Sequence, residues 1–161
     1  GTTTDFTIEW WMYIPTSQTG NNLAVMQFGT GANDYIRKRN DGGTGGTTHV
    51  LHSGFGDVGR AITLGNWHHL SLCRHSSTVY FYVDGAIAND YGPGGYSASN
   101  SWAYDVTNGV QFKIGDTTDA ISSYTAIHAK FYGFQYFQGY AKYPNGTTFT
   151  VPTTAFSNSS Q

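Results

Sequence analysis

A nine-residue stretch near the N-terminus alternates apolar and more polar residues with a period of two. The apolar set is Phe6, Ile8, Trp10, Met12 and Ile14, and the residues between them are Thr7, Glu9, Trp11 and Tyr13. Successive side chains of a strand point to opposite faces, so this pattern is typical of a strand with one buried face. A proline at position 15 ends the pattern, because it cannot donate a ladder hydrogen bond.

The rest of the chain also favours strands. Lys, Arg, Asp and Glu together make up 11% of the 161 residues, Glu9 is the single glutamate, and 21 residues are glycine. Helix-forming residues are therefore scarce, whereas aromatic residues reach 16%. Further strands are expected at 23–28, 35–39, 49–53, 58–64, 67–75, 79–83, 86–89, 110–115, 126–138 and, as an edge strand, 149–151.

Two local signals refine these expectations. Asp84-Gly85 lies between two alternating runs and predicts a tight hairpin turn. The apolar phase changes between Phe131 and Phe134, so we expect a β-bulge at Gly133. Ten or so short strands without a helix predict an all-β fold, a two-sheet antiparallel β-sandwich of the jelly-roll kind. We expect one domain over 1–156 and a flexible tail at 157–161.

Three blocks resemble the laminin-G-like jelly rolls of the concanavalin A-like lectin/glucanase superfamily. The first is 5–15, the second is Asn66-Trp-His-His-Leu with Val79-Tyr-Phe-Tyr-Val-Asp-Gly85, and the third is 135–143 with 149–156. The third block is similar to the closing segment of phage and viral members. Such members usually have one more strand before the first block, supplied here by a separate part of the protein or by a neighbouring chain. Their usual arginine in the closing block is replaced by Gln135, so its carboxylate partner is absent or satisfied differently.

The residues argue against catalysis. Glycoside hydrolysis needs two carboxylates, and the Glu-x-Asp-x-x-Glu motif of the resembling glucanases cannot form with a single glutamate. His69 and Cys73 share a strand about 13 Å apart, too far to act as a pair. Cys73 is expected to be a buried thiol, and the spacing of His49 and His52 does not suit a metal site on a strand. We therefore expect no enzyme activity.

The charge and the hydropathy of the chain each argue against one class of partner. The net charge is −2, and the only basic cluster is Arg37-Lys38-Arg39, interpreted as a solvated strand edge. Without a basic stripe we expect no nucleic-acid binding. No apolar run approaches the roughly 18 residues of a membrane span, so we expect no membrane insertion.

Loop 90–105 is the candidate contact surface. It is rich in the aromatic and short polar residues that dominate recognition loops and sugar sites. The candidate ligand-binding residues are Tyr91, Tyr96, Trp102, Tyr104 and Asp105. The alternative is that this loop packs on the sandwich or on a neighbouring subunit. Trp11, Tyr13, Tyr80 and Tyr82 also point away from the expected core, and they form a second contact patch unless long loops cover them.

The resemblance implies a non-catalytic structural or adhesion protein at a virion surface, as a phage fibre, tail or capsid-decoration component. Its partners would be host glycans or neighbouring virion subunits, in a homo-oligomer or larger assembly. The alternatives are a secreted, extracellular carbohydrate-binding module and a purely architectural subunit.

No cofactor is required, but laminin-G-like domains often hold calcium at a loop rim. The candidate ligands are Asp34, Asp116 and Asp119, because calcium prefers hard oxygen donors. If these residues bind Ca²⁺, isothermal titration will show heat on calcium addition and chelation will lower the melting temperature. A flat titration together with an unchanged melting temperature contradicts the site.

Overall fold

The computed structural model describes residues 5–28, 35–41, 48–53, 58–76, 78–88, 96–97, 112–115 and 124–153. All regular elements in these ranges are strands: β1 (Phe6–Tyr13), β2 (Leu23–Phe28), β3 (Tyr35–Asp41), β4 (Thr48–Ser53), β5 (Val58–Ile62), β6 (Trp67–His75), β7 (Thr78–Val83), β8 (Ala86–Ile87), β9 (Tyr96–Ser97), β10 (Phe112–Ile114), β11 (Thr125–Ala126) and β12 (Lys130–Gln138). In the described part of the chain, no helix is long and apolar enough to span a membrane.

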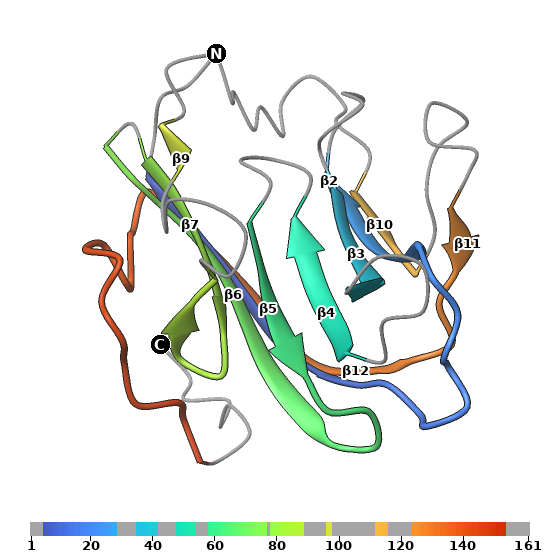
Figure 1. Ribbon diagram of the computed structural model, residues 1–161. Coiled ribbons are helices and arrows are strands. Elements are labelled where there is room, and N and C mark those ends of the chain that lie inside the picture. Colours follow the sequence, from blue (N-terminus) through green and yellow to red (C-terminus); the bar gives the residue numbers. More distant parts are fainter. Residues whose placement is uncertain are drawn as a thin grey trace.

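The strands form two sheets packed face to face (Figure 1). One sheet, sheet A, has the order β12-β1-β6-β7-β8, with β9 beside β7. The other, sheet B, has the order β10-β2-β3-β4-β5, with β11 parallel to β2. All other pairings are antiparallel. The all-β sandwich expected from the sequence is therefore confirmed.

The core lies between the sheets and follows the alternation of the sequence. On β1 and at the residue that follows it, the core contains the predicted set, Phe6, Ile8, Trp10, Met12 and Ile14, each at most 3% exposed. On β6 and β7, Leu70, Leu72, Val79, Phe81 and Val83 face the same interior. Odd-numbered β1 residues consequently point to the outer face of sheet A. Since β1 is a central strand, that outer face runs across β12, β1, β6 and β7.

Two predicted irregularities are confirmed. Asp84 and Gly85 both have positive φ, 53° and 72°, as a type I′ hairpin turn requires. The register between β1 and β12 shifts between Glu9 and Trp11, opposite a glycine at position 133 with φ of 63°. This bulge lets Tyr132 stand opposite Trp11 on the outer face.

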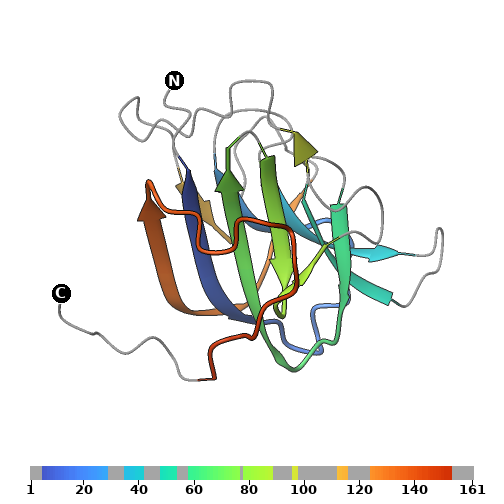
Figure 2. The same ribbon diagram turned by 90° about the vertical axis from the view of Figure 1, so that its left-hand side faces the viewer.

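Three predictions are wrong. The single strand expected at 126–138 is divided into β11, which pairs with β2 in sheet B, and β12, which pairs with β1 in sheet A. The expected edge strand at 149–151 does not form; residues 139–153, here called the C-terminal segment, instead cross the outer face of sheet A without strand pairing (Figure 2). Lys38, expected at a solvated edge, is fully buried on the same side of β3 as Ile36. Its Nζ donates to the Gly20 carbonyl at 2.5 Å and to Asn40 Oδ1 at 2.6 Å. These two acceptors allow an ammonium to occupy this end of the sandwich.

Burial lowers the pKa of Lys38 to about 8. In the unfolded chain a lysine titrates near 10.4, so the unfolded state binds the proton more tightly, and stability rises with pH between these values. Lys38→Met lacks this group. The quantity to compare is the free energy of unfolding of the wild type minus that of Lys38→Met. We expect this difference to increase by about 1–2 kcal/mol between pH 7.5 and pH 9.5. Denaturant unfolding at both pH values measures it, and a pH-independent difference contradicts it.

Candidate binding site on the outer face of sheet A

The C-terminal segment covers part of the outer face of sheet A. Backbone hydrogen bonds hold it near both ends. Gly139 N donates to the Asp5 carbonyl at 2.7 Å, and Phe149 N donates to the Gly85 carbonyl at 2.8 Å. A Cβ at Gly85 would collide with the Phe149 carbonyl, so the close approach requires glycine there. Figure 2 shows the segment passing over β1, β6 and β7.

Beneath this segment lies the only glutamate of the chain. The Glu9 side chain is fully buried, and its carboxylate accepts hydrogen bonds from Lys142 Nζ at 2.6 Å and Tyr143 OH at 2.8 Å. His69 Nε2 lies 3.6 Å away. Burial alone would raise the pKa of Glu9, but His69, Lys142 and Tyr143 together outweigh it and lower the pKa. The carboxylate is thus ionised and anchors the segment.

Gln135, which takes the place of the usual arginine of the closing block, lies next to this anchor. It stands opposite Glu9 in the β1–β12 register. Lys142 and Tyr143 reach the same carboxylate from above the sheet instead. The Glu9 carboxylate therefore has hydrogen-bond partners without an arginine at position 135.

Aromatic and sulfur contacts complete the covered area. The Tyr143 ring stacks on Phe149 at 3.6 Å between centroids, and Phe149 meets the edges of His69 and Tyr82. Cys73 is buried as expected, with Tyr143 N 3.4 Å from its Sγ, and burial raises the pKa of this thiol. Tyr82 is fully buried and donates to the Tyr143 carbonyl at 2.8 Å. Tyr82 is therefore removed from the second contact patch proposed from the sequence.

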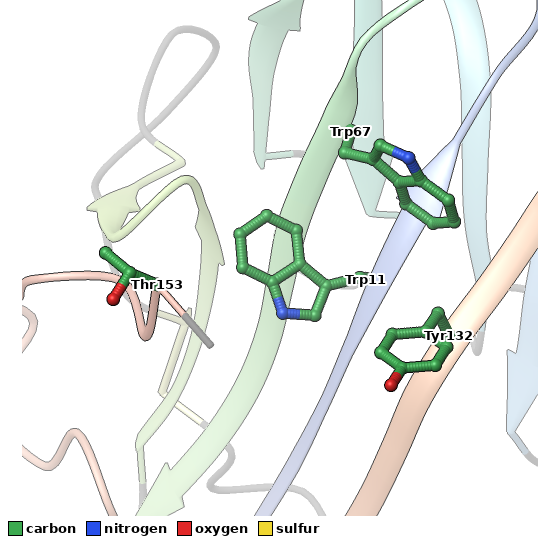
Figure 3. Close-up of a pocket in the computed structure, with 4 residues that line it drawn as sticks. All are labelled: Trp11, Trp67, Tyr132 and Thr153. Carbon is green, nitrogen blue, oxygen red and sulfur yellow. The ribbon is translucent and has the colours of Figure 1, made fainter. Parts of the chain in front are cut away.

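The remaining part of the outer face is open and aromatic. A pocket of about 260 Å³ is lined by Trp11, Trp67, Tyr132 and Thr153, from β1, β6, β12 and the C-terminal segment (Figure 3). Trp67 is 46% exposed and Tyr132 is 54% exposed. Trp11 is partly exposed, whereas its Nε1 atom is buried. We call these four residues the aromatic pocket.

Strand register explains why the rings meet. Trp11 stands opposite Tyr132 on β12, and Tyr13 stands opposite Trp67 on β6. The Tyr13 and Trp67 rings are 5.7 Å apart, which extends the aromatic surface by one row. At the start of β6, His68 bonds Asp84 Oδ2 at 2.6 Å and the Thr63 carbonyl at 2.9 Å, which fixes the backbone beside Trp67.

The sequence analysis identified one of the four pocket residues, Trp11, and the neighbouring Tyr13. Trp11 and Tyr13 were singled out by their parity, whereas Trp67 and Tyr132 were not. The signal for Tyr132 was the predicted bulge at Gly133, which sets the outward residues of β12. Trp67 shares the parity of the outward residues of β6.

The other candidate residues lie outside the described residues: Tyr91, Trp102, Tyr104 and Asp105 of the loop, and Asp34, Asp116 and Asp119 of the calcium prediction. Of Tyr96 only the backbone is described, in β9, where it pairs with Val79. Among the described residues, no group of three His, Cys, Asp or Glu side chains could hold a metal ion. Both predictions stay open.

Lys142→Met tests the anchor, because it leaves the Glu9 carboxylate buried without its cation. We expect a loss of about 3 kcal/mol in the free energy of unfolding. The double variant Glu9→Gln/Lys142→Met removes both charges and should be more stable than the sum of the two single losses predicts. Denaturant unfolding of the four proteins measures the coupling, and strictly additive losses would show that the pair does not hold the segment.

The chain is similar in sequence to a known superfamily and in structure to solved proteins. Residues 1–126 match the sequence pattern of the concanavalin A-like lectin/glucanases superfamily. No curated protein sequence matches the chain. Among solved structures, a Bacteroides ovatus protein described as a candidate carbohydrate binding protein matches 93% of this chain at 19% identity with a TM-score of 0.52. Domain 4 of AbnA, an extracellular arabinanase from Geobacillus stearothermophilus solved with arabinotriose, matches 84% at 16% identity with a TM-score of 0.35, too low to carry an argument.

The chain spans 40% and 58% of the lengths of these two structures. At 19% identity, the similarity to the Bacteroides ovatus structure shows a shared fold only. The superfamily match covers β1 to β11 and ends before β12, so Tyr132, Lys142 and Thr153 lie beyond it. It nevertheless extends over well more than half of the chain, and the sandwich agrees with it. The chain belongs to the concanavalin A-like lectin/glucanase superfamily.

Proposed function

We propose that this chain is a non-catalytic carbohydrate-binding domain and that the aromatic pocket is its glycan site. One observation carries the proposal: three partly exposed aromatic rings from three adjacent strands surround a single pocket. Aromatic faces bury the apolar C–H surface of a sugar ring, and a few polar groups fix its hydroxyls. Thr153 supplies such a group at the wall of the pocket.

The pocket is large enough to enclose part of a saccharide rather than all of it. About 260 Å³ lies just below the roughly 300 Å³ at which pockets for drug-sized ligands begin. A saccharide would place one ring in the pocket and extend along the neighbouring Tyr13–Trp67 row. Exposed apolar patches of this kind commonly mark binding surfaces. The description of the Bacteroides ovatus structure as a candidate carbohydrate binding protein is in line with this function.

The pocket residues also favour binding over hydrolysis. A glycosidase needs two carboxylates flanking the bond that is cleaved. The four lining residues include none, and the nearby Glu9 is buried and paired beneath the C-terminal segment. Bound sugar would therefore meet rings and hydroxyls rather than an acid–base pair.

A second candidate function is contact with neighbouring subunits, in the virion setting expected from the closing block. It is favoured by the edge position of β12 in sheet A and by the exposure of Phe134, Tyr136 and Tyr140. The virion surface, an assembly of several copies, the contact role of loop 90–105 and the calcium site stay predictions. A secreted module with the same pocket is the alternative setting.

Trp67→Ala tests the glycan site. Trp67 is exposed, so we expect the variant to fold and to lose roughly tenfold to hundredfold in affinity, because the apolar area that the indole buries against the sugar is lost. A glycan array followed by titration calorimetry on the strongest hit measures this loss.

Two matched variants decide between sites. Tyr140→Ala removes an equally exposed aromatic ring outside the pocket and should bind as the wild type does. Trp102→Ala removes the candidate residue of loop 90–105. Loss of binding in Trp102→Ala with normal binding in Trp67→Ala would move the site to the loop, and an array without hits would favour the subunit-contact function.

A further inference from the structure

A lysine stands at the edge of the aromatic pocket. Lys130 begins β12, is exposed, and lies opposite Tyr13 in the β1–β12 register. Its Nζ is 5.5 Å from the centre of the Tyr13 ring, which in turn lies 5.7 Å from the ring of Trp67. Lys130 is also two residues before Tyr132 on the same face of β12, a step of about 7 Å. The residue pair Lys130–Tyr13 is therefore adjacent, along the two strands, to the pair Tyr132–Trp11 that lines the pocket.

The described carboxylates near sheet A are all engaged elsewhere. Glu9 is bound to Lys142 and Tyr143 under the C-terminal segment. Asp84 pairs with His68 at 2.6 Å, and Asp5 lies 3.0 Å from His75 Nδ1. Within the described side chains, Lys130 has the Tyr13 ring as its neighbour and no carboxylate partner. The open part of the face thus carries a positive charge that these carboxylates do not neutralise.

A lysine over an aromatic ring keeps its capacity to bind an anion. The ring attracts the ammonium through its quadrupole, which restrains the side chain without neutralising its charge. The three N–H donors can still form charge-assisted hydrogen bonds, which are stronger than neutral ones. A sugar ring stacked on Trp67 and Tyr132 would present its substituents toward this ammonium.

We propose that the aromatic pocket selects anionic saccharides, with Lys130 binding the carboxylate of a uronic acid or the sulfate of a sulfated sugar. This inference rests on the proposed glycan site and adds the substrate class. Lys130 is the specificity-determining residue, and the aromatic rings supply binding that does not depend on ligand charge.

The test uses defined saccharides in matched pairs on one array: oligogalacturonates with their methyl esters, and sulfated glycans with their unsulfated forms. We expect the hits that Trp67→Ala loses to be anionic members of these pairs. Lys130→Gln should weaken them roughly fivefold, as expected for one partly exposed charge pair, and leave binding of the neutral members unchanged. Raising the salt from about 50 to 500 mM should reproduce this loss in the wild type.

Lys113→Gln is the control, because it removes the same charge from β10 in sheet B, away from the pocket. It should bind anionic saccharides as the wild type does. The oligogalacturonate pairs test binding of a carboxylate and the sulfated pairs test binding of a sulfate, so together they identify which anion is bound. If neutral saccharides bind in a Trp67-dependent way as tightly as their anionic partners, or if Lys130→Gln and wild type bind the anionic members equally, the charge selectivity is overturned and the glycan site is left intact. Absence of any Trp67-dependent binding overturns both.

Discussion

The ion pair between Glu9 and Lys142 is the interaction on which the outer face of sheet A depends. A carboxylate on the solvent side of a sheet needs no cover, yet this one is fully buried. Burying it unpaired would cost several kcal/mol, so the cation and the tyrosine hydroxyl that meet it must be in place whenever the C-terminal segment is. Glu9 and the segment therefore fold as one unit.

This unit divides the outer face in two. On one side, Thr7, Glu9, Cys73 and Tyr82 lie beneath the C-terminal segment, and on the other Trp11, Trp67 and Tyr132 stay accessible. Thr153, at the end of the described segment, lines the pocket together with these three rings. The anchor that stabilises the segment thus also positions one side of the proposed binding site. Two of the four pocket residues, Tyr132 and Thr153, lie beyond the part of the chain that matches the superfamily, and the other two, Trp11 and Trp67, lie within it.

Local patterns in the sequence predicted most of the sandwich. The alternation of β1, the paired runs of β6 and β7, the Asp84-Gly85 turn and the Gly133 bulge each depend on neighbouring residues, and the structure confirms them. The position of the C-terminal segment depends instead on contacts over more than 130 positions, such as Lys142 with Glu9. Alternation at Phe149 and Val151 was therefore misread as an edge strand, and the burial of Lys38 was missed because its acceptor, the Gly20 carbonyl, lies on another segment. Of the four pocket residues, only Trp11 was identified from the sequence, for the same reason: the alternation shows which side chains point outward, but the strand register decides which of them lie side by side.

The four tryptophans provide the most direct test of the account, since together they report on three different places. Trp10 is in the core, Trp11 and Trp67 are in the aromatic pocket, and Trp102 belongs to the loop considered as the alternative site. Indole N–H signals in a ¹H–¹⁵N correlation spectrum can be assigned by single substitutions and followed while the strongest array saccharide is added. The account predicts that the Trp11 and Trp67 signals shift and saturate together while those of Trp10 and Trp102 stay in place. A shift confined to Trp102, or no shift in any of the four, would contradict it.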